Sequence, residues 1–346
     1  MAIYYLAFGL SMFFAWLCMH MKSYVKKRKI GYAVFFSAMP LFLVAALRYG
    51  IGADYFSYIH IFQLAEIGIF PKIEFLFNFT NLAIAYVGLS EQWFFIVCAA
   101  LFCFFTYRAI FEESPYPVLS VFLLLGMYFF LASLNIVRQM VGASILLFGI
   151  KFIISGELKK YVLCVIAAFG FHFSCILFLP FYWLRNFKMT RKKVIFLSIL
   201  VVAALSTNIL DNIIFNIMPL FNVEHYIGSK YDDGKVGYIY MIIQLGIDAL
   251  VWWQYRDNVK YNTYFNIQLI NTWISFLLGR VPLISRFRYL FGFPCIILLP
   301  LALAHVENKG LRQALTVSVF IFYLLYIHLA DKTNTGVLPY ASVLDF

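Results

Sequence analysis

Long apolar runs separated by short polar connections make up most of the chain. A helix that crosses a membrane needs about 20 mostly apolar residues. The runs that approach this length are residues 2–20, 30–47, 73–89, 92–107, 117–134, 136–154, 161–184, 194–210, 237–255, 264–281, 289–305 and 313–329. No polar stretch between them could hold a soluble domain. We therefore predict an all-α, polytopic transmembrane helix bundle of about 12 spans, forming a single integral membrane domain over residues 1–346.

Two clusters of basic residues suggest how the chain is oriented. "KSYVKKRK" (Lys22–Lys29) and "RNFKMTRKK" (Arg185–Lys193) each hold five basic residues and no acidic one. Such loops are retained in the cytoplasm. We expect the first apolar run, which has no basic residue before it, to be an uncleaved anchor with its N-terminus outside. Residues 48–72 and 211–236 would then be external loops.

Two stretches do not fit a simple alternation of spans. Residues 55–70 place His60, Gln63 and Glu66 among apolar residues, which predicts an amphipathic helix lying on the outer surface. Residues 161–184 lie between the basic connection "SGELKK" and the second basic cluster. Two alternatives stay open: the segment crosses once, or it is a re-entrant pair of half-helices with "GFHFS" at the tip.

Composition agrees with a membrane protein. The chain is 64% hydrophobic and only 12% charged, whereas soluble proteins average about a quarter charged residues. The net charge of +11 is explained by cytoplasmic loops and lipid headgroups, so we expect membrane lipids and no nucleic acid as partners. The cysteines lie inside apolar runs without a CxxC pair, and no nucleotide or DxD motif occurs, so neither a metal nor a cofactor is expected.

Polar residues inside apolar runs are candidates for function. Asn135, Arg138 and Gln139 share one helix face. A permanently charged guanidinium there needs an anion or a wet cavity, although contacts between helices would also explain the cluster. His172, in "FGFHFS", could transfer protons or bond a sugar, or it could be a core residue.

The stretch "RYGIGADYFSY" places Arg48, Asp54 and Tyr55 where the chain leaves a predicted span. Gly50 and Gly52 permit a tight turn. Asp54 could pair with Arg48 or lie near a reacting hydroxyl group.

Further candidates come from later segments and from two carboxylates. Arg280, Arg286 and Arg288 would lie on the outer side, where an arginine cluster runs against the usual charge bias, although Arg286 and Arg288 could also be snorkelling residues. His225 and Tyr226 in the second external loop are candidates for sugar contact. Glu74 and Glu91 are weaker candidates, because each could simply mark a membrane interface.

Together these residues suggest one external pocket. Arginines favour an anion such as a diphosphate, and tyrosines favour sugars. A site at the membrane surface favours a lipid-linked ligand. We therefore expect a polyprenyl-diphosphate-linked sugar donor.

Four segments in order, "RYGIGADYFSYIHIF", "SLNIVRQMVGASI", "FHFS" and "RFRYLF", resemble the EpsG-like branch of the Wzy-type polysaccharide repeat-unit polymerases. The resemblance runs from Arg48 to about Phe291. It implies a multi-pass protein of the bacterial inner membrane that polymerises undecaprenyl-diphosphate-linked oligosaccharides on the outer face. A chain-length regulator is a further candidate partner. The matching positions are Arg48, Gly50, Asp54, Tyr55, Asn135, Arg138, Gln139, His172 and Arg288, with Arg286 competing for the role of Arg288.

The reaction expected from this resemblance is attack of an acceptor sugar hydroxyl on the anomeric carbon of the donor, with diphosphate as leaving group. Arg138 and Arg288, supported by Arg48, would stabilise that leaving group, and Asp54 or His172 would be the general base. Three alternatives stay open: an O-antigen ligase, a transporter of lipid-linked oligosaccharides, and an acyltransferase that uses Asp54 and His172.

Overall fold

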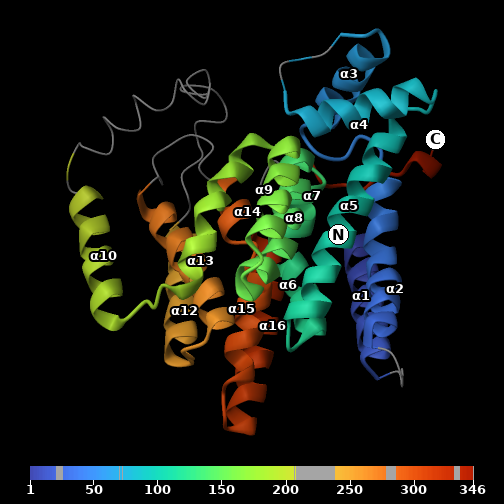
Figure 1. Cartoon of the computed structure of the whole chain (residues 1–346). Coiled ribbons are helices and arrows are strands. Elements are labelled where there is room, and N and C mark those ends of the chain that lie inside the picture. The colour runs from blue at the N-terminus through green and yellow to red at the C-terminus, as the bar shows by residue number, and fades with distance from the viewer. Residues whose placement is uncertain are drawn as a thin grey trace.

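The computed structural model describes residues 1–20, 26–69, 71, 73–205, 207, 238–277, 286–330 and 336–345. Within these ranges the regular structure is helical, apart from one isolated backbone bridge between Arg48 and Ser342. The prediction of an all-α protein is therefore confirmed. The long helices run side by side as a bundle, and two short ones lie across one end (Figure 1).

Eight helices form most of the bundle in the described part of the chain: α1 (Ala2–His20), α2 (Lys26–Ala46), α5 (Gln92–Glu113), α8 (Val137–Ser155), α10 (Arg191–Leu205), α12 (Tyr238–Trp253), α13 (Val259–Leu277) and α16 (Lys309–Ala330). Within the described ranges, four segments, in α1, α5, α8 and α16, are each long and apolar enough to cross a membrane, and several other helices are apolar but shorter. Large apolar side chains on α1, α2, α10 and α16 are exposed, as expected of surfaces that meet lipid. The chain is a multi-pass membrane protein, while the count of about 12 spans stays a prediction.

Three predicted spans are interrupted. Residues 117–134 divide into α6 (Pro117–Gly126) and α7 (Phe129–Ser133), with Tyr128 between them in a left-handed conformation at φ 70°. Residues 289–305 divide into α14 (Phe287–Phe291) and α15 (Cys295–Ala304). Residues 161–184 divide into α9 (Leu158–Phe171) and the 3₁₀ helix η1 (Phe173–Asn186).

Helix α9 and η1 form a hairpin with His172 at its tip. Each limb has 14 residues. The far end of η1 returns to the start of α9, because the Tyr182 hydroxyl donates a hydrogen bond to the Gly156 carbonyl at 2.7 Å. The structure therefore agrees with the re-entrant alternative, in which both flanking basic connections lie at the same end of the bundle.

The expected span at residues 73–89 is wrong. This segment contains α4 (Phe75–Tyr86), whose 12 residues reach only about 18 Å, short of the roughly 30 Å of membrane hydrocarbon. The neighbouring long helices also meet at one end, since Gln92 Nε2 at the start of α5 donates to the Ala46 carbonyl at the end of α2, 2.5 Å away. The intervening chain leaves and returns on the same side. Helix α4 lies there beside α3 (Figure 1).

Helix α3 (Tyr55–Glu66) is the amphipathic helix expected from the sequence. Its buried face carries Tyr55, Tyr58 and Phe62. The polar residues His60, Gln63 and Glu66 are exposed.

We call the end of the bundle that carries α3 and α4 the α3–α4 end. The opposite end, which we call the basic end, holds the last turn of α5, the connection from α8 to α9 and the start of α13. Its basic residues include Lys151, Lys160, Arg185, Lys188 and Lys260, several of them in ion pairs with Glu112, Glu113, Glu157 and Asp257.

The six cysteines are free, and five of them are buried. They act as small packing residues, as expected. One of them, Cys175 of η1, lies where a Cβ at Gly142 of α8 would approach its sulfur to 2.5 Å. Glycine at this position lets the hairpin pack closely against α8 and so places His172 beside the start of that helix.

Candidate functional site

Glu74, directly before α4, joins three segments that are far apart in sequence. Its Oε2 accepts a hydrogen bond from Arg138 Nη1 of α8 at 2.6 Å. Its Oε1 lies 3.1 Å from Nδ1 of His172 and accepts the backbone N–H of Phe173 at 3.1 Å. The Glu74 side chain is only 9% exposed, whereas that of Arg138 is 26% exposed. The carboxylate is therefore enclosed while part of the guanidinium stays accessible.

The environment of Glu74 keeps it ionised. Burial alone raises the pKa of a carboxyl group. Here the hydrogen bond from His172 and the positive charge of Arg138 outweigh burial and lower the pKa of Glu74 to about 2. A fixed negative charge orients both the guanidinium and the imidazole.

Asp54 lies at the start of α3, where the charges of Arg138 and Arg286 act on it. Its backbone N–H donates to Asn135 Oδ1 at 3.0 Å. Burial raises the pKa of Asp54 above its usual value, although the charges of Arg286 and Arg138 oppose this shift. Among the sequence candidates, this carboxylate is the one on which the charges of both arginines act.

Arg286 is positioned by α8. Gln139, the residue after Arg138, donates from Nε2 to the Arg286 backbone carbonyl at 2.6 Å. The charge of Arg286 acts on both Asp54 and His172. The prediction that Asn135, Arg138 and Gln139 share one helix face is wrong for Asn135, which lies in the turn before α8. The three side chains still contact three other segments, one segment each.

Aromatic residues surround Arg138. The guanidinium carbon of Arg138 lies over the Phe77 ring, 5.1 Å from the ring centre. Burial raises the pKa of Tyr58 to about 12, although the charge of Arg138 opposes this shift. Tyr58 therefore stays neutral and contributes a polar hydroxyl beside the cation.

Arg48 and Tyr55 lie apart from this cluster, in the packing beneath α3. Arg48 is 2% exposed, and its guanidinium lies 4.7 Å from the centre of the Phe95 ring. The Tyr55 ring stacks on the same Phe95 ring, with the ring centres 4.5 Å apart and an angle of 6° between the ring planes. Burial lowers the pKa of Arg48 to about 10, since no carboxylate among the described residues pairs with it.

The Arg288 side chain lies among tyrosines. Its Nη2 donates to the Tyr289 hydroxyl at 2.5 Å, and its guanidinium lies over the Tyr289 and Tyr240 rings at 4.6 and 5.7 Å. Of the two competing arginines, Arg286 is the one whose charge acts on Asp54. Arg280, His225, Tyr226 and the predicted loop 211–236 lie outside the described residues.

Sequence reasoning undervalued Glu74 and missed Tyr58. From the sequence, Glu74 is predicted to mark a membrane interface, because it stands at the start of the apolar run of residues 73–89. Tyr58 lies three positions after Tyr55, on the same face of α3. That spacing was an available signal.

A buried polar seam on α12 and α13 was also missed. Gln268 is its centre, donating to Gln244 Oε1 at 2.9 Å and to Asp248 Oδ1 at 3.0 Å, and accepting from Cys295 Sγ at 2.7 Å. Asn271 extends the seam by donating to Gln244 Oε1 at 2.9 Å. The spacing of Gln244 and Asp248, four positions apart on one helix face, was the available signal.

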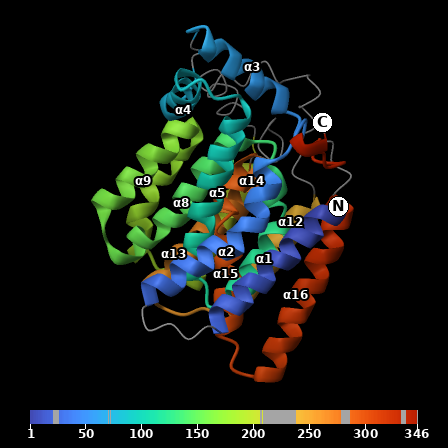
Figure 2. The same cartoon turned by 90° about the vertical axis from the view of Figure 1, so that its right-hand side faces the viewer.

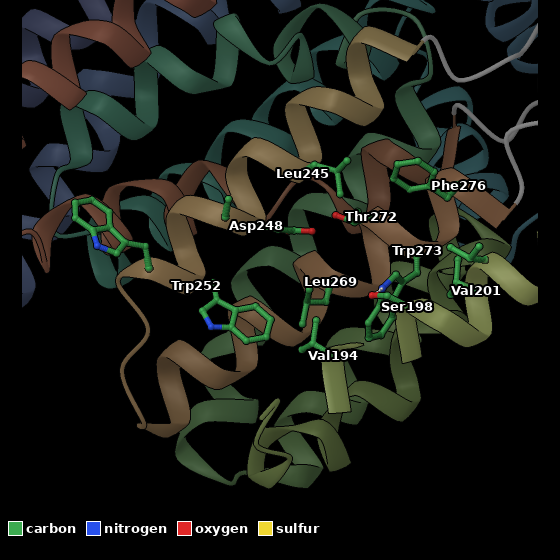
Figure 3. Close-up of a pocket in the computed structure, with 13 residues that line it drawn as sticks. Val194, Ser198, Val201, Leu245, Asp248, Trp252, Leu269, Thr272, Trp273 and Phe276 are labelled. Atoms are coloured by element: carbon green, nitrogen blue, oxygen red, sulfur yellow. Dashed lines mark hydrogen bonds between the residues drawn. The ribbon is translucent and has the colours of Figure 1, made fainter. Parts of the chain in front are cut away.

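The seam borders a cavity of about 460 Å³ between α10, α12 and α13. Figure 3 shows Asp248 and Thr272 on one wall, with Trp252, Leu269 and Trp273 around them. The lining is mainly apolar, and it contains none of the residues around Glu74.

The cluster at the α3–α4 end therefore combines two cations, two carboxylates and a histidine. Such a set can bind an anionic group at Arg138 and Arg286 and can accept a proton at Asp54. Among the described residues, no three histidine, cysteine or acidic side chains lie close enough to hold a metal ion.

Comparison with known proteins gives one relationship. No curated protein and no solved structure matches the chain. The family model that matches covers residues 31–342, nearly the whole chain. The chain therefore belongs to the EpsG family, which is associated with Wzy-type polysaccharide polymerases.

Proposed function

We propose that this protein is a Wzy-type polymerase. It joins undecaprenyl-diphosphate-linked oligosaccharide repeat units at the outer face of the bacterial inner membrane. The observation that carries the proposal is the cluster of Glu74, Arg138, His172, Asp54 and Arg286, which come from five separate segments of the chain. Family membership independently supports polysaccharide biosynthesis.

Arg138 and Arg286 stabilise the leaving group. When the bond between the anomeric carbon and the diphosphate oxygen breaks, negative charge develops on the undecaprenyl diphosphate. Preorganised cations are suited to that charge, and loss of one such group commonly costs on the order of 10²–10³ in rate. Glu74 holds Arg138 at 2.6 Å, so the guanidinium is oriented before the substrate arrives.

Asp54 is the general base. It takes the proton from the acceptor hydroxyl as that oxygen forms the new bond to the anomeric carbon. Its raised pKa makes it a better proton acceptor than an exposed aspartate, and general-base catalysis contributes about 10²–10⁴. Nδ1 of His172 is occupied by Glu74, so its Nε2 is the ring atom that remains to bond a sugar hydroxyl.

The charge distribution supports an outward-facing site. Basic residues concentrate at the opposite end of the bundle, and cytoplasmic loops retain such residues. Lipid-linked repeat units would therefore meet Arg138 on the exterior side.

Substitution of Arg138 tests the proposal. Purified protein is supplied with the undecaprenyl-diphosphate-linked repeat unit as both donor and acceptor, and chain length is followed by gel electrophoresis. Arg138→Ala is expected to lower the rate by about 10²–10³. Arg138→Lys is expected to retain only part of the activity, because an ammonium cannot make bidentate contacts.

The matched control is Arg312→Ala on α16, whose guanidinium contacts the Val306 carbonyl at 3.4 Å and lies at the basic end. It should polymerise like the unmodified chain. Normal polymer length with Arg138→Ala at normal expression would contradict the assignment of Arg138. Transfer that occurs only with a different glycolipid acceptor would instead indicate a ligase.

A further inference from the structure

The last described segment of the chain, residues 336–345, lies against the loop that leads into α3. We call it the C-terminal strap. Three backbone hydrogen bonds join them: Gly52 N–H to the Gly336 carbonyl at 2.8 Å, Tyr49 N–H to the Ala341 carbonyl at 3.0 Å, and Val343 N–H to the Leu47 carbonyl at 2.9 Å. Figure 2 shows the C-terminus at the α3–α4 end, near the start of α3.

Two tyrosines fasten the strap to the bundle. The Tyr4 hydroxyl of α1 donates to the Val337 carbonyl at 2.8 Å, and this bond is buried. The Tyr340 hydroxyl donates to the Val44 carbonyl near the end of α2 at 3.0 Å. Val337 is itself only 2% exposed. The strap is thus packed into the structure and does not simply rest on its surface.

Glycines allow three backbone segments to stack. A Cβ at Gly336 would lie 3.1 Å from the Ala53 nitrogen and 3.3 Å from the Gly52 carbonyl carbon. A Cβ at Gly52 would lie 2.4 Å from the Leu134 carbonyl oxygen. Both glycines also have positive φ, +67° and +99°, a conformation that other residues rarely adopt. The loop is therefore held between the strap and the turn that precedes α8.

The stack ends at the candidate site. Asp54 follows Gly52 by two residues, and its N–H is held by Asn135, which follows Leu134. A shift of the strap would move the loop, and with it the Asp54 carboxylate relative to Arg138 and Arg286. The same stack gives Arg48 a role, because its backbone bridges Ser342 while its side chain packs on Phe95.

We propose that the C-terminal strap is a positioning element of the candidate site, which holds the loop of residues 48–54 so that Asp54 faces the two arginines. Its consequence for catalysis rests on the proposed function. Its consequence for the loop does not, so two separate measurements are needed.

The first measurement is amide hydrogen exchange on the full-length protein in detergent. Gly336→Ala adds a methyl group against the loop, and Tyr340→Phe removes one hydroxyl bond and leaves the strap otherwise unchanged. Exchange at the Gly52 and Asp54 amides should accelerate about ten-fold in Gly336→Ala and less in Tyr340→Phe, while amides within α5 and α8 keep their rates.

The matched control is Gly88→Ala. Gly88 has a similar φ of +72°, but a Cβ there would meet nothing within 4 Å. It carries the same kind of backbone strain without the contact, so exchange at Gly52 and Asp54 should not change. Unchanged exchange at these amides in both strap variants would overturn the proposal, whatever the protein catalyses.

The second measurement is the polymerisation assay on the same variants. Misplacement of a base affects the chemical step more than substrate binding. We therefore expect kcat to fall about ten-fold in Gly336→Ala while KM for the lipid-linked donor changes less than about two-fold. Faster exchange with unchanged kcat, in a protein that Asp54→Ala inactivates, would overturn the strap proposal and leave the proposed function standing. Absence of polymerisation by the unmodified chain would overturn the proposed function and with it the catalytic part of the strap proposal, while the exchange result would still decide its effect on the loop.

Discussion

At the scale of single residues, the half-buried Arg138 is stable because Glu74 accompanies it. An ion pair that is removed from water is costly to break, since the surviving charge is left without a partner. Glu74 also contacts His172, so one carboxylate orients both the Arg138 guanidinium and the His172 imidazole. The Phe77 ring below Arg138 adds a favourable cation–π contact at 5.1 Å.

Replacement of Glu74 by Gln should therefore affect more than one residue. We expect a loss of roughly 10–100-fold in polymerisation, as is common when a supporting group of a site is removed, together with a lower melting temperature. The exposed Glu91→Gln, directly before α5, is the matched control and should behave like the unmodified chain. Normal activity of Glu74→Gln would show that the oriented pair is not needed.

The ionisation of Glu74 also predicts how stability depends on pH. Its pKa in the folded protein, about 2, is below the usual 4.5. The carboxylate therefore contributes stability that is complete above about pH 4.5 and is lost as the pH falls toward 2. Thermal melting between pH 2 and 6 should show this loss for the unmodified chain and a smaller one for Glu74→Gln. Equal pH dependence of both proteins would contradict the assignment.

The pKa of Asp54 is raised, in contrast to that of Glu74, and this predicts how activity depends on pH. Its pKa is raised in the fold, and Arg286 opposes the rise. A general base must be deprotonated, so the acid limb of the pH–rate profile should lie above pH 3.8, the usual value for aspartate. Arg286→Gln removes a nearby positive charge and should move this limb to higher pH, whereas Arg312→Gln should not. A limb that stays in place would exclude Asp54 as the titrating base.

At the scale of helices, interruptions create the site. The hairpin of α9 and η1 brings His172 to its tip, and the break between α6 and α7 at Tyr128 precedes the turn that carries Asn135. The polar seam between α12 and α13 lies within continuous helices and does not depend on an interruption. Its polar side chains satisfy one another inside an apolar bundle, where an unpaired polar group is costly.

Removal of the central seam residue tests that interpretation. Gln268→Leu leaves Asp248 Oδ1 without the donor now 3.0 Å away, and a buried group that loses its partner costs about 1–3 kcal/mol. The melting temperature in detergent should fall. The control is Gln313→Leu on the exposed face of α16, which should be neutral. Equal stability of both variants would show that the seam contributes little.

At the scale of the whole molecule, charge is unevenly distributed between the two ends. The basic end carries lysines and arginines that are partly neutralised by acidic neighbours. The α3–α4 end carries the smaller set of arginines around Asp54 and Glu74. This asymmetry is the physical basis of the proposed orientation.

Thiol labelling in intact cells checks the orientation. Ser57→Cys on the exposed face of α3 should react with a membrane-impermeant maleimide, whereas Lys309→Cys at the start of α16 should react only after permeabilisation. The unmodified chain gives the background. The reverse labelling pattern would place the site in the cytoplasm and contradict the proposed function.

Several features could be predicted from the sequence because they depend on local patterns. Apolar runs predicted the helical membrane fold, spacing predicted the amphipathic face of α3, and residue spacing grouped Arg138 and Gln139 on α8, whereas Asn135 lies in the turn before that helix. Asp54, His172 and Arg286 were selected because polar groups among apolar ones need partners. The resemblance carried by short motifs agreed with the family match.

The partners themselves were decided only by the tertiary structure. Hydropathy could not show that α4 turns back on one side of the bundle, because an apolar run looks alike whether it crosses the membrane or packs against its end. For the same reason Glu74 could not be recognised as the partner of Arg138, 64 positions away. In the sequence, Arg48 and Arg288 carry the same charge as Arg138 and look equally suited to the site. Only the structure shows that Arg48 packs on Phe95 and Arg288 on Tyr289. Sequence determines which groups need a partner, and the close approach of distant segments determines which partner each one receives.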